Sequence, residues 1–284
     1  MTAPARLARL SFNQATARDW PLPDLVAGCV AAGVPAVGLW REQVAAYGLA
    51  ATAALIRDSG LAVTSLCRGG FFSQPGWFDD NRRAIDEAAA LATPELAEPV
   101  LVLVSGGLPD GSTDLDGARA RVGEAVGRLV PHARAAGVRL AIEPLHPMYA
   151  ADRCVVSTLD QALALATPYP ADTVGVVVDT YHLWWDDRVW DAIARAGQQR
   201  RLACLQVADW VTPLPAGALV GRGLPGEGCI DLRRFVSAAA AAGYHGPVEL
   251  EVFQERLWSR PGPEILAATI ESYLAHVAPP EEES

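Results

Sequence analysis

One repeated pattern constrains the fold of this chain more than any other feature. An alanine-rich segment, a glycine and a short apolar run follow one another in CVAAGVPAVGLW, LIRDSGLAVTSLC, ARAAGVRLAIEP and AAAAGYHGPVELEV. The glycines suit the left-handed position that ends helices; they are Gly33, Gly60, Gly137 and Gly243. The apolar runs are too short for helices and are typical of parallel strands buried on both faces. The pattern therefore predicts repeated helix–strand units.

Four further apolar runs complete a set of strands. Strands are expected near residues 8–13, 36–40, 63–67, 100–105, 139–144, 174–179, 202–208 and 247–253. Helical segments fall between them, for example 24–33, 81–92, 118–137 and 231–243. Such an alternation predicts an α/β fold, a (β/α)8 TIM barrel, as a single domain over residues 1–278, with a disordered acidic tail at 279–284. A doubly wound open sheet is disfavoured because no G-x-G-x-x-G follows an early strand.

Composition excludes several classes of function. The formal net charge of −10 argues against nucleic acid as a partner, because phosphate binders carry basic patches. The chain contains no lysine, which excludes the usual Schiff-base, PLP and Walker-A chemistries. No apolar run or N-terminal segment indicates membrane insertion or secretion. Five scattered cysteines indicate reduced thiols, so a cytoplasmic protein is expected. The acidic net charge favours a small molecule as the partner.

Acidic and amide side chains come at the ends of four successive predicted strands. Glu143 ends the fifth strand and Asp179 the sixth, Gln206 lies in the seventh, and Glu249 and Glu251 lie in the eighth. The carboxyl ends of barrel strands meet at one mouth, where barrels place their active sites. Carboxylates cannot share a partly buried mouth without a counter-charge. A divalent cation supplies it most simply, and oxygen ligands favour Mn²⁺ or Mg²⁺ over Zn²⁺.

Some polar residues and loops have a plainer interpretation. Asp209 is expected to act as a cap or loop hydrogen-bonder, and Glu249 as an interior group paired with an arginine such as Arg139. Residues 69–79 and 209–230 are expected to form long loops at the barrel mouth. The stretch SGGLPDGS at 105–112 resembles a phosphate-cradling turn, although glycine-rich turns are common.

Several motifs together resemble a known family. AIEPLHP, VDTYHLWWD, QVADW, GRGLPGEGCIDL and GYHGPVELEVF make the chain similar to the xylose-isomerase-like superfamily of sugar isomerases and epimerases. The resemblance implies one divalent metal ion, with Mn²⁺ expected and Mg²⁺, Co²⁺ or Zn²⁺ as alternatives. Its implied ligands are Glu143, Asp179, Gln206 and Glu251. Many members have histidine where Gln206 stands.

The resemblance also implies a reaction. Glu143 and Glu251 would be the catalytic acid and base of a keto-sugar or cyclitol isomerase/epimerase that works through a metal-stabilised enediolate. The implied substrate-binding residues are His182, His146, Arg68, Arg222, Trp40, Phe71, Trp184 and Trp210. A subunit contact is the alternative role for Trp184, in a homodimer or homotetramer.

Two other activities stay open. The same proton abstraction leads to a lyase, such as an inosose-type dehydratase or a keto-glycoside-cleaving enzyme, if a neighbouring substituent leaves. A DNA-repair enzyme of the endonuclease IV type is less consistent with the net charge of −10 and with five histidines.

Overall fold

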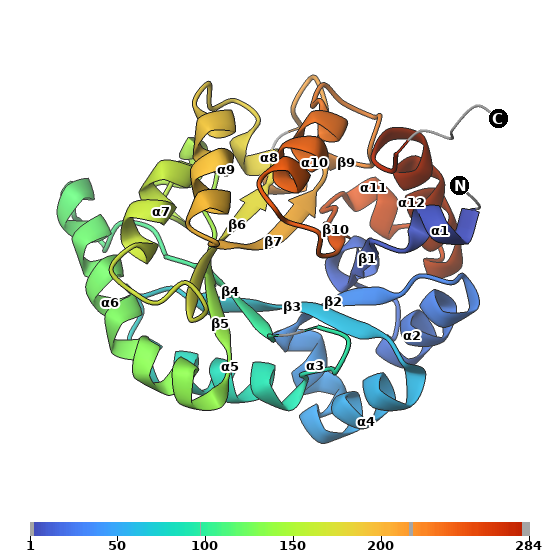
Figure 1. The fold of residues 1–284 in the computed structure, drawn as a ribbon, viewed down its shortest axis with the longest axis horizontal. Helices are drawn as coiled ribbons and strands as arrows, with labels where there is room; N and C mark the ends of the chain where they lie inside the picture. The colour runs from blue at the N-terminus through green and yellow to red at the C-terminus, as the bar shows by residue number, and fades with distance from the viewer. Residues whose placement is uncertain (1–2, 97, 216–217, 280–284) are drawn as a thin grey trace.

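Eight parallel strands close into a barrel in the computed structural model, which describes residues 3–96, 98–215 and 218–279 (Figure 1). Neighbouring strands follow the order β1-β10-β7-β6-β5-β4-β3-β2. Their bounds are β1 Leu10–Asn13, β2 Ala36–Trp40, β3 Ala62–Gly70, β4 Val100–Val104, β5 Arg139–Ile142, β6 Val174–Asp179, β7 Leu202–Val207 and β10 Val248–Leu250. All eight predicted strands are confirmed, and the open-sheet alternative is wrong. The expected acidic tail falls almost entirely outside the described residues.

Helices surround the barrel (Figure 1). The longer ones are α2 Leu22–Ala31, α4 Leu49–Ser59, α5 Trp77–Ala90, α6 Leu115–Ala136, α7 Leu159–Ala166, α9 Val189–Gln198, α10 Leu232–Ala241 and α12 Gly262–His276. Shorter helical turns are α1 Ala3–Leu7, η1 Gln14–Ala17, α3 Arg41–Tyr47, η2 Pro147–Tyr149, α8 Thr180–Leu183, η3 Ala218–Val220 and α11 Glu255–Trp258. Within the described ranges, no helix combines the length and apolar character needed to cross a membrane.

Helix ends follow the local chemistry of the sequence. Asp114 accepts a 2.8 Å hydrogen bond from the Gly117 amide at the start of α6, and Asp231 accepts one of 3.1 Å from Arg234 at the start of α10. Such side-chain caps satisfy amides that have no partner within the helix. The four glycines of the repeated pattern all have positive φ, as predicted.

Register places polar side chains of neighbouring strands at one level inside the barrel. Gln206 on β7 lies opposite Asp179 on β6 and opposite Glu249 on β10. The apolar side chains of β6 before Asp179 are fully buried, since Val176, Val177 and Val178 have no exposed surface. Strand β6 is thus apolar and buried up to Asp179, where the polar side chains begin.

The two expected long loops differ from the prediction. Strand β3 continues to Gly70 and α5 begins at Trp77, so the connection between them is shorter than expected and spans only residues 71–76. Residues 209–230 contain a two-stranded antiparallel sheet of β8 Asp209–Trp210 and β9 Arg222–Gly223. Asp209 accepts hydrogen bonds from the amides of Gly226, Gly228 and Ile230, which confirms it as a loop hydrogen-bonder.

Candidate active site

Three carboxylates meet at the C-terminal mouth of the barrel. Glu143 follows β5, Asp179 ends β6 and Glu251 follows β10. Their residues are 6%, 0% and 3% exposed. Because the strands are parallel, their carboxyl ends share one mouth, and the three groups interact electrostatically there. We call Glu143, Asp179 and Glu251 the carboxylate cage.

Arg222 lies against the cage and carries the counter-charge that the structure itself supplies. Its Nη1 is 2.9 Å from Asp179 Oδ2 and 3.2 Å from Glu251 Oε2. The same atom donates a 3.1 Å hydrogen bond to the backbone oxygen of Glu251. Arg222 comes from β9, in the long loop after β7, and is 2% exposed. The sequence predicted a substrate contact for Arg222 and did not predict this pairing.

One guanidinium does not neutralise three buried carboxyl groups. Burial, followed by the charges of Asp179 and Glu251, raises the pKa of Glu143 well above its ordinary value. Burial raises the pKa of Glu251 to about 8 and also raises that of Asp179, although Arg222 opposes both shifts. Burial lowers the pKa of Arg222, but the charges of Asp179 and Glu251 raise it by more than burial lowers it. The pKa therefore lies above its ordinary value, and the guanidinium stays charged. The carboxylate cage is therefore stabilised either by a second cation or by protons that stay bound to its carboxyl groups.

His182 lies beside the cage on α8. Its Nε2 is 3.1 Å from Arg222 Nη2 and 4.0 Å from Asp179 Oδ2, and its Nδ1 is 3.2 Å from the His146 amide nitrogen. Burial, then the charge of Arg222, lowers the pKa of His182 well below its ordinary value. A neutral imidazole has one acceptor nitrogen, so it can satisfy only one of these two donors.

Two carboxylates of the cage and a neighbouring histidine lie close enough together to share a divalent cation. One ligand atom from each of Glu143, Asp179 and His182 lies within 4.8 Å of the others, so this group includes a histidine that the sequence assigned to the substrate. Glu251 Oε1 and Gln206 Oε1 are buried and accept no hydrogen bond, whereas Asp179 Oδ2 is paired with Arg222. Buried oxygens without donors are expected where a cation is to bind.

Glu249 has a different environment from the one predicted. Arg139, the predicted partner, donates instead to the backbone oxygen of Arg200 at 2.7 Å and lies 3.7 Å from Glu98. The pairing was wrong because Arg139 begins β5, at the opposite end of the strands from the mouth.

Four neutral side chains hold the Glu249 carboxylate. Asn13 Nδ2 donates to Oε1 at 2.7 Å, Gln206 Nε2 donates to Oε1 at 2.8 Å, and Ser65 Oγ lies 3.0 and 2.9 Å from the two oxygens. Thr64 Oγ1 donates to Oε2. Sequence reasoning missed Asn13, Thr64 and Ser65, although polar residues inside apolar strands were the signal available.

The remaining predicted substrate residues fall into two aromatic groups. Arg68 lies over the rings of Phe71 and Trp40, at 4.5 and 5.7 Å from their centroids. Trp210 lies 5.0 Å from His146 and 5.4 Å from Trp184, and stacks on Tyr181 at 4.8 Å. His146, Trp184 and Trp210 are therefore brought together beside His182, and their role in substrate binding stays a prediction.

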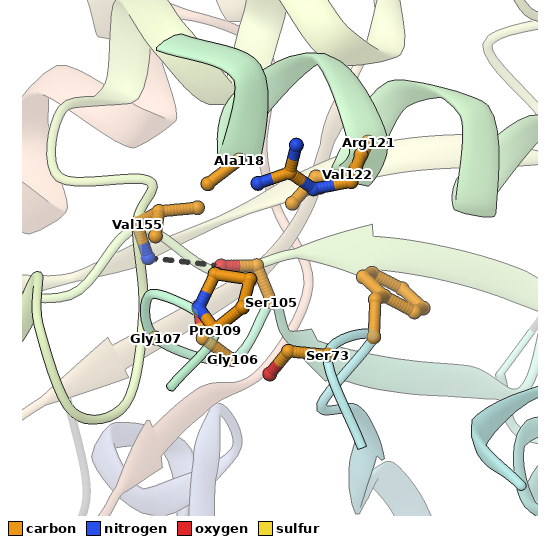
Figure 2. Close-up of a pocket in the computed structure, with 10 residues that line it drawn as sticks. Ser73, Ser105, Gly106, Gly107, Pro109, Ala118, Arg121, Val122 and Val155 are labelled. Atoms are coloured by element: carbon orange, nitrogen blue, oxygen red, sulfur yellow. Dashed lines mark hydrogen bonds between the residues drawn. The ribbon is translucent and has the colours of Figure 1, made fainter. Parts of the chain in front are cut away.

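The glycine-rich stretch 105–112 lines a pocket of its own (Figure 2). This cavity of about 240 Å³ lies between the residues that follow β4 and the first turns of α6, with Arg121 on its helix side. Ser105 Oγ accepts a 3.1 Å hydrogen bond from the Val155 amide. Asp114 lies 3.8 Å from Arg121 and offsets its charge. A phosphate site at this turn stays a prediction.

Known proteins resemble the chain over different lengths. The crystal structure of protein SMc04130 from Sinorhizobium meliloti 1021 is 45% identical, with a TM-score of 0.90, and the match covers 96% of this chain and 100% of that one. The IOLI protein, solved with a binding zinc atom, shares the fold at 19% identity and a TM-score of 0.78, over 95% of this chain and 98% of that one.

Among curated proteins, an inosose isomerase from Bacillus subtilis (strain 168) is 29% identical over 121 residues. That match covers 42% of this chain and 41% of the relative, so the chain spans less than half the length of that relative. Residues 26–276, which make up most of the chain, match the xylose isomerase-like TIM barrel family. The chain therefore belongs to that family.

Proposed function

We propose that the protein is a divalent-metal-dependent isomerase or epimerase of a keto-sugar or cyclitol. The observation that carries this proposal is the pair of buried carboxyl groups with raised pKa values, Glu143 and Glu251, which come from different strands and share one cage with Asp179. Membership of the family supports the proposal, and so does the partial match to an inosose isomerase.

The two glutamates supply the acid–base chemistry. A general acid or base works best when its pKa lies near the working pH, and in the metal-free site burial raises the pKa of both glutamates above the ordinary value. One glutamate removes the proton from the carbon next to the substrate carbonyl, and the other returns a proton to give the epimer or isomer. Burial keeps bulk water away from both groups.

Charged and polar neighbours orient the substrate. Arg222 Nε is a buried donor without a hydrogen-bond partner, and it is available to bind a carbonyl or hydroxyl oxygen of the substrate. The aromatic groups around Trp40 and Trp210 supply flat apolar surface against which a sugar face packs.

Glu143, Asp179, Gln206 and Glu251 would hold the metal ion, for which we propose Mn²⁺ because the donors are mainly oxygens. When bound, the ion polarises the carbonyl and makes the neighbouring C–H more acidic.

Isotope exchange tests this function. The Mn²⁺-loaded protein is incubated with a panel of keto-sugars and inososes in D₂O, and mass spectrometry follows the products. Deuterium incorporation with an intact carbon skeleton supports isomerisation or epimerisation. Loss of water or of an aglycone identifies a lyase instead, and absence of exchange on the whole panel contradicts proton abstraction.

A matched pair of variants assigns any exchange to the cage. Glu143→Gln removes one proposed acid–base group and should abolish deuterium incorporation. Glu124→Gln makes the same change at an exposed position on α6 and should leave the exchange rate unaltered. Equal rates in both variants would show that the exchange takes place without Glu143.

A further inference from the structure

Gln206 lies between two acidic side chains of neighbouring strands. Its residue is 1% exposed and lies opposite Asp179 on one side and Glu249 on the other. Its Nε2 donates a 2.8 Å hydrogen bond to Glu249 Oε1, whereas its Oε1 is buried and accepts no hydrogen bond. A buried amide oxygen that accepts no hydrogen bond destabilises the folded protein unless a ligand binds to it.

Glu249 determines which end of the amide remains free. A carboxylate only accepts hydrogen bonds, so the amide nitrogen must face it. A turned amide would bring Gln206 Oε1 against a carboxylate oxygen at hydrogen-bond distance. With Nε2 held by Glu249, Oε1 is the atom left without a partner, and the register places Asp179 on the other side of Gln206 from Glu249.

The position of Glu249 is itself determined by its surroundings. Asn13, Ser65 and Thr64 donate to its two oxygens. Gly38 on β2 leaves the space for the carboxylate, because a Cβ at that position would lie 2.6 Å from Glu249 Cδ. The carboxylate is therefore held by hydrogen bonds and by packing, and it has little freedom to follow a rotation of Gln206.

We propose that Glu249 is a positioning residue that holds the Gln206 amide with Oε1 available to the metal ion, and that this pair sets the metal preference of the site. The inference rests on the proposed function for its metal ion and identifies what selects that ion. With Gln206, the four proposed ligands from the strands are all oxygens, which favours Mg²⁺ and Mn²⁺ relative to Zn²⁺. An imidazole at the same position would favour Zn²⁺ more strongly.

Metal titrations test the inference without any substrate. Dissociation constants for Mn²⁺ and Zn²⁺ are measured by isothermal titration calorimetry on protein stripped with a chelator. Gln206→His should raise the ratio of Zn²⁺ to Mn²⁺ affinity at least tenfold. Glu249→Gln keeps the shape but lets the facing amide turn, and it should weaken Mn²⁺ binding by about 10–100-fold, as loss of a group that orients a ligand typically does.

Controls separate this inference from general damage and from the proposed function. Gln198→His adds a histidine at an exposed position of α9 and should leave the affinity ratio unchanged. Far-UV circular dichroism and thermal unfolding check that each variant is folded. If Glu249→Gln does not fold, the affinity ratio of Gln206→His alone tests the inference. An unchanged ratio in Gln206→His, unchanged Mn²⁺ affinity in folded Glu249→Gln, or wild-type protein that binds no divalent ion would each overturn the inference. Wild-type protein that binds Mn²⁺ with the expected variant effects, yet exchanges no substrate proton, would contradict the proposed function alone.

Discussion

Glu249 and Glu251 lie two residues apart and are almost equally buried, at 1% and 3% exposure, yet their surroundings are opposite. Glu249 accepts hydrogen bonds from four neutral side chains. Glu251 faces two other carboxyl groups, has Arg222 as its cationic neighbour and has an oxygen without a hydrogen bond.

The difference separates a structural carboxylate from a functional one. A buried charge that is fully hydrogen-bonded stabilises the arrangement around it, and removing it leaves several donors unpaired. A buried charge that is only partly compensated raises the free energy of the empty site, which is typical of groups that bind or react. Four predictions test this comparison.

The largest effect is expected on activity at the partly compensated position. Glu251→Gln should lower the rate of deuterium exchange by about 10²–10⁴-fold, the usual contribution of a general acid or base. The free energy of unfolding of the metal-free variant should stay at or above the wild-type value at neutral pH, because a neutral amide avoids the cost of burying a carboxyl group whose pKa is raised. Exchange kinetics and urea unfolding measure the two quantities. A variant that is active but markedly unstable would reverse the assignment.

The next largest effect is expected on stability at the hydrogen-bonded position. Glu249→Ala leaves Asn13, Ser65 and Gln206 with unpaired buried donors, so we expect a loss of about 3–5 kcal/mol in the free energy of unfolding. Urea denaturation of metal-free protein measures it, with Glu251→Ala as the matched comparison. A loss below about 1 kcal/mol would mean that water replaces the carboxylate without cost.

The pH dependence of stability should follow the cage. The pKa of Glu251 is near 4.5 in an unfolded chain and about 8 in the folded protein, so the folded state binds more protons between these values. The contribution of Glu251 to the stability of metal-free protein is therefore fully present below about pH 4.5 and is lost as the pH rises to about 8, by at most about 1.4 kcal/mol per pH unit.

Thermal unfolding in the presence of a chelator, at pH 5 and at pH 8, measures this slope. Glu251→Gln should flatten it, and added Mn²⁺ should raise the midpoint more at pH 8 than at pH 5, because the ligands must be ionised. A wild-type slope that rises with pH would show that the cage carboxyls are not the groups that titrate.

The smallest effect is expected from the space beside Glu249. Gly38→Ala would place a Cβ 2.6 Å from Glu249 Cδ and 2.8 Å from Asn13 Nδ2. Overpacking of this kind costs about 1–3 kcal/mol, so the free energy of unfolding should fall by that amount. Gly123→Ala is the control, since its nearest contact would be an ordinary 3.4 Å to Leu165. Equal stability of the two variants would show that the surroundings of Glu249 can relax.

Residues whose position depends on strand order were predicted well. The alternation of apolar runs and alanine-rich helices identified all eight barrel strands. It could do so because the spacing of apolar residues within each helix and strand is a property of the local sequence. Because parallel strands share one mouth, the same pattern predicted that Glu143, Asp179 and Glu251 would meet there.

Residues whose role depends on contacts across the barrel were not predicted. Arg222 comes from a loop whose path follows from the β8–β9 pairing and from the hydrogen bonds of Asp209, so its contact with Asp179 could not be derived from spacing. Glu249 has partners from β1, β3 and β7, and the sequence suggested Arg139 instead.

By itself, the sequence determined the barrel and the end of the barrel at which the acidic side chains lie, because strand periodicity and helix ends are local properties. The tertiary structure alone decided which carboxylate is satisfied and which is not. The closed barrel brings together Asn13, Ser65 and Gln206 around Glu249, and brings Arg222 and two other carboxyl groups to Glu251. Hydrogen bonds and charge interactions act over a few ångströms in space, and such distances exist only once the barrel has closed.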